Sequence, residues 1–391
     1  EASGDDAVGP EANTTPPSDT TATTGDGTSP IEDAGPEQAP TTRVYATIVT
    51  HNEQDVNQGC QPVLADESLF DANRAMTVAF AHAIVEAGGA WDMQSDFRWI
   101  DQMEAWESEE DRAETGGMNI LAWLATEFPG QITVDAHNHE SNHNYADVQK
   151  RLQDLGVPDT GVVGGLLWSP TENEDWTRFR EPLAGKQFPD FTWSPTILWG
   201  AATMNHAGPD SEASGVWRPK AADAFHTDDP EGNLINIGLY RDAKYEIGGG
   251  EGLAELIQEV RDGVHPEGVM LTVSIFTDQC QMTAEEIDEF VALIEGHQAD
   301  VDDGLLVWAT LPDVAETWKT VYGGQAYIVN APEETPDGPE EDCAKDGCPQ
   351  GMVCCEPPAP CAGTCVDHCG KDPSSCPPQT VCLDSGLCGP E

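Results

Sequence analysis

Between residues 43 and 330 the chain alternates β-branched apolar runs with amphipathic helical patterns, and this alternation limits the fold to a few classes. Residues 44–50 (VYATIVT) are typical of a buried strand. Residues 66–86 place apolar side chains on one helical face, and Gly88 and Gly89 mark the end of that helix. We expect further strands at residues 93–99, 132–134, 161–168, 196–199, 234–240, 269–276 and 305–310, and further helices at residues 119–127, 145–156, 252–262 and 284–295.

Strands that each lead into a helix form parallel sheets, because the helix returns the chain to the starting edge of the sheet. The sequence therefore predicts an α/β fold. The most economical closure over residues 43–330 is a distorted (β/α)7–8 barrel, and a doubly wound open sheet is the alternative. In both folds the functional groups gather after the carboxyl ends of the strands.

Two segments of different composition flank this central region. Residues 1–42 contain no Lys, Arg or aromatic residue, so we expect a disordered linker that cannot bury enough apolar surface to order itself. Residues 331–342 form a second, Pro- and Glu-rich linker. Residues 343–391 hold ten of the twelve cysteines, and this density predicts a small module stabilised by disulfides.

The charge of the chain limits its partners and its location. The formal net charge of -54 would repel nucleic acids and anionic membranes. No apolar run approaches the ~18 residues of a membrane span. The cysteine density and the start at Glu1 rather than Met indicate export. We expect a bacterial extracellular or cell-surface protein, monomeric, for which a lipid anchor upstream of Glu1 is one option.

A histidine cluster follows the expected strand at residues 132–134. His137, His139 and His143 lie within seven residues of one another, close to Asp135. Neutral imidazole is the commonest transition-metal ligand, and residues four apart share a face once the backbone turns helical. The pattern predicts a metal or catalytic site, and a hydrogen-bonded polar loop is the alternative.

Further polar residues follow other expected strands. His51 and Glu53 come after the first strand, and Asp278 comes after the penultimate one. Because the carboxyl ends of parallel strands meet at one edge, we expect these side chains near the histidine cluster. Cys60 and Cys280 lie in the same two loops, so closure of a barrel predicts a disulfide between them.

Two motifs in this region are similar to those of the NodB-like polysaccharide deacetylases. Asn138-His139-Glu140-Ser141-Asn142-His143 matches their Asn-His-[Ser/Thr]-x-x-His motif in spacing, and Arg180-Glu181-Pro182 resembles their Arg-x-Pro motif. The likeness covers roughly residues 43–322. It has departures: His51-Asn52 replaces the family's Asp-Asp pair, and Thr277-Asp278 stands where a His-Asp pair is usual.

The resemblance implies a metal-dependent hydrolase that removes acetyl groups from a polysaccharide or another glycan. His139 and His143 would hold a divalent metal, foremost zinc, and His51 or Glu53 would be the third ligand. Asp278 or Asp135 would be the catalytic base, and Arg180 would complete the catalytic set. The cysteines of the tail, which include the adjacent pair Cys354 and Cys355, resemble those of whey-acidic-protein modules, with a zinc site as the alternative.

Two other functions remain open from the sequence. His51-Asn52-Glu53 resembles the first-strand motif of some glycoside hydrolases, which need two carboxylates ~5 Å apart if they are retaining enzymes. Alternatively, the barrel is a non-catalytic surface protein that binds a glycan or another partner, since the usual Asp-Asp pair is missing.

Overall fold

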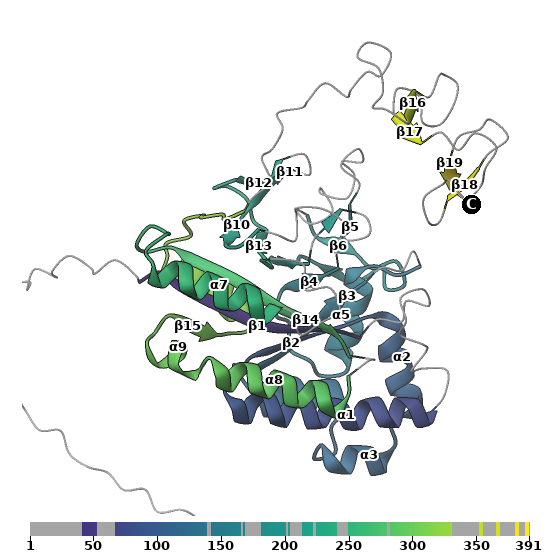
Figure 1. The fold of residues 1–391 in the computed structure, drawn as a ribbon. Coiled ribbons are helices and arrows are strands. Elements are labelled where there is room, and N and C mark those ends of the chain that lie inside the picture. The colour runs from purple at the N-terminus through teal and green to yellow at the C-terminus, as the bar shows by residue number, and fades with distance from the viewer. Residues whose placement is uncertain are drawn as a thin grey trace, which may run out of the picture. The chain divides into compact units, whose positions relative to one another are not determined.

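The computed structural model is organised around a nine-stranded, mostly parallel sheet (Figure 1). It describes residues 41–52, 67–138, 142–165, 167–168, 181–200, 202–203, 213–221, 224–240, 249–279, 282–330, 352–354, 365–367, 380–382 and 388–390. The sheet has the order β10-β13-β8-β4-β3-β2-β1-β14, and β15 also pairs with β1. The strands are β1 (Arg43–Asn52), β2 (Trp91–Ser95), β3 (Ile132–His137), β4 (Val162–Gly164), β8 (Ile197–Trp199), β10 (Val216–Trp217), β13 (Ile235–Ile237), β14 (Met270–Asp278) and β15 (Leu306–Trp308).

The helices follow the strands, as the alternating pattern predicts. Three of them begin with a capping box. In this motif the side chain of the residue before the helix accepts a hydrogen bond from the backbone amide of the third helical residue, and the side chain of that third residue accepts one from the backbone amide of the residue before the helix. The helices are α1 (Glu67–Ala87), α2 (Phe97–Trp106), α3 (Glu109–Glu114), α4 (Ile120–Glu127), α5 (Tyr145–Asp154), α7 (Gly249–Arg261), α8 (Ala284–Gly296), α9 (Gln298–Asp302) and α10 (Leu311–Thr320).

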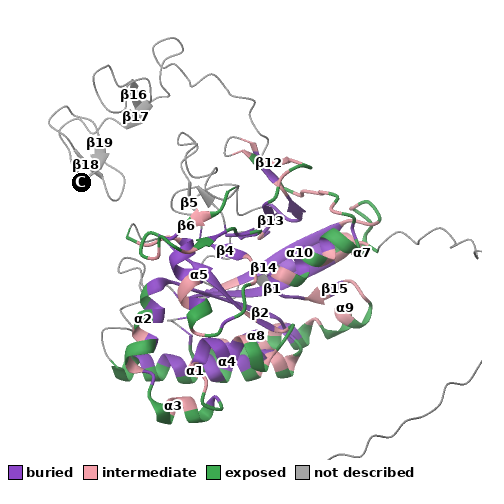
Figure 2. Cartoon of the chain, turned by 180° about the vertical axis from the view of Figure 1, so that it is seen from behind, coloured by how far each residue is buried: buried purple, intermediate pink, exposed green. Residues whose placement is uncertain are grey.

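Alternate residues of the strands separate into two apolar clusters. In Figure 2 the strands of the central sheet are coloured mostly as buried, and the outer helices carry exposed residues. On one face of β1, Val44, Ala46 and Ile48 pack with the cluster that includes side chains of α1, α4, α7 and α8. On the other face, Tyr45 and Val49 pack with the cluster that includes α10. We call the second surface the inner face. It also carries the polar residues of the candidate site.

The two ends of the strand order approach each other. The backbone amide of Ser274 in β14 donates to the carbonyl of Leu239, two residues beyond β13, over 2.9 Å. The Thr272 hydroxyl donates to the Gly238 carbonyl over 2.7 Å. The sheet is therefore strongly curved, although the described ladders do not include a closed barrel.

Several strands end at positions other than those expected from the sequence. β3 continues to His137, so Asp135 and His137 lie within the strand rather than in the loop after it. β1 likewise includes His51 and Asn52. β2 ends at Ser95, because Asp96 accepts a hydrogen bond from the Trp99 amide and begins α2. The candidate side chains are therefore anchored by strand backbone.

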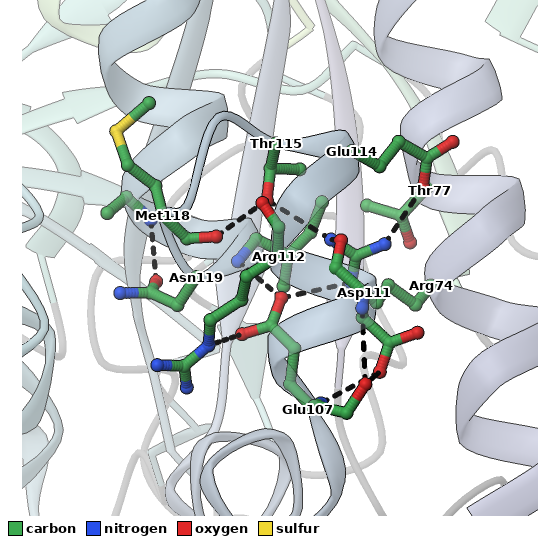
Figure 3. Close-up of polar contacts among 12 residues, drawn as sticks. Arg74, Thr77, Glu107, Asp111, Arg112, Glu114, Thr115, Met118 and Asn119 are labelled. Carbon is green, nitrogen blue, oxygen red and sulfur yellow. Dashed lines mark hydrogen bonds and ion pairs between the residues drawn. The ribbon is translucent and has the colours of Figure 1, made fainter.

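A buried ion network fixes the segment from α2 to α4 against α1 (Figure 3). Arg74 of α1 donates through Nε to Glu107 Oε1 at 2.9 Å, and both side chains are almost fully buried. Glu107 also accepts from Arg112 Nε at 3.1 Å and from the Ile120 amide at 2.8 Å. One carboxylate thus connects α1, α3 and the start of α4.

Small two-stranded pairs complete the described residues. They are β5 (Leu167–Trp168) with β9 (Ala202–Thr203), β6 (Leu183–Ala184) with β7 (Thr192–Trp193), β11 (Pro219–Ala221) with β12 (Ala224–Asp228), β16 (Met352–Cys354) with β17 (Cys365–Asp367), and β18 (Thr380–Cys382) with β19 (Cys388–Pro390). None of the described helices is both long and apolar enough to cross a bilayer.

Candidate functional site

Four polar residues lie in one register row across four adjacent parallel strands. His51 of β1 pairs with Asp278 of β14 on one side and with Gln94 of β2 on the other. Gln94 pairs in turn with Asp135 of β3. The row lies near the carboxyl ends of the strands, which is the edge at which α/β folds place their functional groups.

His51 and His137 lie beside each other at this edge. Their ring centroids are 4.0 Å apart with the planes tilted by 47°, and both residues are buried. Phe276 and Trp199 pack against His51 with centroid distances of 4.4 and 5.6 Å. Trp199, the last residue of β8, is thus next to the site.

Gln94 and two glycines fix the position of His137. Gln94 Oε1 lies 3.2 Å from His137 Nδ1, within hydrogen-bond distance. A Cβ on Gly165 would come within 2.2 Å of the His137 ring, and a Cβ on Gly164 would come within 1.8 Å of Gln94 Oε1. Only glycine leaves room for the ring and the amide at these two positions.

Asp92 and Asp135 form a carboxyl pair on the same inner face, both with 0% exposure. The Thr133 hydroxyl donates to Asp92 Oδ2 over 2.6 Å, and the Thr160 hydroxyl donates to Asp135 Oδ1. The Leu311 amide in the first turn of α10 also bonds Asp92, at the end of the helix that favours a negative charge.

The environment makes the two aspartates unequal. Burial raises the pKa of Asp135 well above its usual range, and the charge of Asp92 and the hydrogen bond between the two carboxyls raise it further. Burial also raises the pKa of Asp92, but hydrogen bonds from Asp135, Thr133 and Leu311 oppose that rise. The pair therefore retains one proton, on Asp135, to higher pH than an isolated carboxyl would.

The other predicted site residues are distributed differently. His143 is described, and its ring stacks on Phe97 of α2 with centroids 3.7 Å apart and an interplanar angle of 15°. Asp278 is placed by its backbone in the row with His51. The predictions for Glu53, His139, Arg180, Cys60 and Cys280 lie outside the described residues.

The chemistry of these residues suits a divalent transition metal, since imidazole and carboxylate are its usual ligands. His51 and His137 supply two neighbouring imidazoles, and Asp278 follows in register. Within the described ranges, no three His, Cys, Asp or Glu side chains are grouped as a metal centre. The predicted ligand set of His139, His143 and His51 stays a prediction.

Sequence reasoning missed Asp92 and Gln94. The signal for them was the period of two in residues 91–95 (WDMQS), where polar residues alternate with Trp91 and Met93. In a strand this alternation places Asp92 and Gln94 on one face. That face is the one that carries His51 and Asp135.

Comparison with protein-family models and with curated proteins found no match. A protein described as a glycoside hydrolase/deacetylase from Parabacteroides distasonis is similar in structure, with 12% identity, coverage of 72% of each chain and a TM-score of 0.44. A 4-alpha-glucanotransferase from Thermococcus litoralis is similar over 74% of this chain and 40% of its own, with 10% identity and a TM-score of 0.36. Both TM-scores are below the level that indicates a shared fold.

Proposed function

We propose that this chain is a metal-dependent hydrolase that removes acetyl groups from a polysaccharide. The observation that carries the proposal is the row His51, Gln94 and Asp135, with His137 beside it, at the carboxyl edge of a parallel sheet. The deacetylase-like spacing of His139 and His143, in the segment that directly follows this edge, supports the choice of substrate class.

The site offers the groups that ester or amide hydrolysis requires. A bound divalent metal would polarise the acetyl carbonyl and lower the pKa of a water molecule. Asp135 is suited to hold and deliver a proton, because burial and Asp92 favour its protonated form. The role of base then belongs to Asp278, and Glu53 and Arg180 remain candidates for positioning the substrate.

The arrangement of the described carboxyls favours deacetylation over glycoside hydrolysis. A retaining glycosidase places its two carboxyl groups ~5 Å apart on either side of the scissile glycosidic bond. Asp92 and Asp135 instead hydrogen-bond each other on neighbouring strands and are fully buried. Asp92 and Asp135 are therefore not spaced like such a pair.

The cellular setting is part of the same proposal. A strongly acidic chain with a Cys-rich tail suits an exported or surface protein that meets polysaccharides outside the cell. The chain would act there as a monomer.

The test is a product assay on acetylated xylan, acetylated chitin oligosaccharides and their deacetylated counterparts. We expect release of acetate without new reducing ends. Release of reducing sugars would favour the glycoside hydrolase, and glycan binding without either product would favour the non-catalytic surface protein.

A matched pair of variants separates the site from general stability. His51→Gln is expected to abolish acetate release. His265→Gln is the control, because His265 is also largely buried and bonds Glu259 and Tyr327 with 3.0 and 3.2 Å contacts. Equal activity losses in both variants would contradict a site at His51.

A further inference from the structure

We infer that Asp147 is a positioning residue, which binds the turn between β6 and β7 to the start of α5 and so holds the segment of residues 138–143 in place. This segment precedes α5 and carries the histidines of the deacetylase-like motif. The inference deepens the proposed function and rests on it, because the position of these histidines affects a reaction only if they take part in one.

The Asp147 carboxylate is fully buried and accepts four hydrogen bonds from backbone amides. Asp147 lies in the first turn of α5 and has 0% exposure. Its Oδ1 accepts from the amides of Gln187 and Phe188 over 2.8 and 3.0 Å. Its Oδ2 accepts from the amides of Lys186 and Asn144, each over 3.0 Å. Hydrogen bonds to a carboxylate are roughly twice as strong as those between neutral groups, so these four tie the turn to the helix. We call them the Asp147 contact.

Two further hydrogen bonds join the same turn to the residues that precede α5. The Gln187 side chain donates through Nε2 to the Asn142 carbonyl over 3.1 Å. Asn144, the N-cap of α5, donates through Nδ2 to the Ala184 carbonyl over 2.8 Å. Asn142 and Asn144 flank His143 in the sequence. The hairpin of β6 and β7 therefore contacts the histidine segment on both sides of this residue.

Gly185 allows the turn to approach Asp147 closely. A Cβ on Gly185 would come within 2.5 Å of Asp147 Oδ1 and within 2.8 Å of the Phe188 carbonyl oxygen. The Gly185 amide donates to the Phe191 carbonyl over 3.0 Å, which closes the turn. A residue without a Cβ is therefore required at this position.

The Asp147 contact lies at the edge of the sheet that carries the candidate site. α5 follows β3, and in an α/β fold such a helix begins at the carboxyl edge of the sheet. Tyr145, the first residue of α5, donates its hydroxyl to the Gly165 carbonyl over 3.3 Å. Gly165 is also the residue that leaves room for the His137 ring. Residues 180–182, the second deacetylase-like motif, directly precede β6, so both motifs adjoin this contact in the sequence.

The experiment compares backbone hydrogen exchange, followed by mass spectrometry, in the full-length parent and three variants. Asp147→Asn keeps the shape of the side chain, but its NH2 group cannot accept the amide hydrogen bonds. We expect exchange to rise at least about 10-fold in residues 184–191 and also in residues 138–146. Gly185→Ala should give the same two changes. Gln187→Ala removes an exposed side chain, which keeps folding out of the question, and should raise exchange in residues 138–146.

Asp159→Ala is the control on the same hairpin. Asp159 accepts from Trp193 Nε1 of β7 over 3.2 Å and has no hydrogen bond to the start of α5 among those of the described residues. This variant should keep parental exchange in residues 138–146 and parental kcat for acetate release. Asp147→Asn should lower kcat roughly 10-fold with little change in KM, because displaced histidines impair the chemical step more than the binding of the glycan.

Thermal melts establish which variants are folded. Parental exchange of residues 138–146 in folded Asp147→Asn and Gln187→Ala proteins would overturn the inference. A kcat loss in Asp159→Ala as large as that in Asp147→Asn would also overturn it, because any loosening of the hairpin would then suffice. Exchange is measured without substrate, so a parent that releases no acetate contradicts the proposed hydrolase, whereas the exchange data decide on the Asp147 contact.

Discussion

Asp135 retains its proton because two effects act in the same direction. Burial disfavours the charged form, and Asp92 on the neighbouring strand adds a second negative charge. Asp92 has compensation that Asp135 lacks, since the Leu311 amide in the first turn of α10 bonds its carboxylate. Hydrogen bonds from Asp135, Thr133 and Leu311 oppose the rise at Asp92, so the pKa of Asp135 is raised further than that of Asp92.

This pair makes the stability of the fold depend on pH. The folded pKa of Asp135 lies above its unfolded value, so the folded state binds more protons, and the stabilisation present below about pH 4 is lost as pH rises through the folded pKa. The Asp135→Asn variant should remove a slope of up to about 1.4 kcal/mol per pH unit in that window. Urea unfolding from pH 4 to 8 measures it.

The control for this prediction is Asp190→Asn, which changes an exposed carboxyl in the turn between β6 and β7. It should show the same pH dependence as the parent. An Asp135→Asn protein with an unchanged slope would show that Asp135 is ionised in the folded state.

Glu107 is the second residue whose environment leads to a prediction. Its carboxylate is fully buried between Arg74, Arg112 and the Ile120 amide. Glu107→Ala would leave the Arg74 guanidinium buried without this partner, so the free energy of unfolding should fall by about 3–5 kcal/mol. Chemical denaturation checks this value.

An exposed ion pair is the comparison. Glu316 and Lys319 lie 3.1 Å apart on α10 with more than half of each side chain exposed. Glu316→Ala should change the stability by less than about 1 kcal/mol. A similar loss in both variants would mean that the burial of Glu107 is not what matters.

At the scale of the elements, the end of β4 has room only for glycine, because the neighbouring side chains lie too close for a Cβ. Its last residue, Gly164, and the adjacent Gly165 occupy positions where any side chain would meet Gln94 or His137. Gly165 also has a positive φ of +72°, which disfavours L-residues. A side chain at either position would therefore displace Gln94 or His137.

A pair of glycine variants separates backbone strain from this contact. Gly263 has a φ of +68° with nothing near its missing Cβ, so Gly263→Ala should cost only the backbone strain, about 1–2 kcal/mol. Gly165→Ala should cost more and should also lower acetate release, because its Cβ displaces His137. Equal effects in thermal melts and in activity would contradict a role of Gly165 in placing the histidine.

The elements with strong local signals could be predicted from sequence. Helices were expected at residues 66–86 and 284–295, and α1 and α8 confirm them. The structure adds the capping box of Thr283 and Glu286 at the start of α8. The strand ends could not be predicted, because β3 continues to His137 through pairing with β2 and β4 rather than through its own composition. As a result, Asp135 and His137 lie in the sheet, whereas the sequence predicted them in the loop after the strand.

For the site, sequence reasoning identified residues but not which of them meet. His51 and Asp135 were predicted to lie together, and one register row through Gln94 contains both. The importance of Asp92 and Gln94 depends on which strands are neighbours, and a single sequence does not contain that information. The pairing of β1 with β2 and of β2 with β3 supplies it.

At the scale of the whole molecule, the link between Cys60 and Cys280 stays a prediction, because both cysteines lie outside the described residues. The strands that precede them, β1 and β14, pair in parallel over their length, from Arg43 with Met270 to His51 with Asp278. The loops that carry the two cysteines therefore start at adjacent points. Peptide mapping under non-reducing conditions should recover a Cys60–Cys280 cross-link, and pairing of either cysteine with residues 343–391 would contradict the prediction.

The central claim is that His51, Gln94, Asp135 and His137 form the working site of a hydrolase. The most direct measurement is the kcat for acetate release by Asp135→Asn and His137→Gln, beside the parent and His265→Gln, on the best substrate of the acetylated series. We predict that kcat falls at least about 100-fold in the two site variants while their thermal melts show folded protein. Parental kcat in folded Asp135→Asn and His137→Gln proteins would contradict the account.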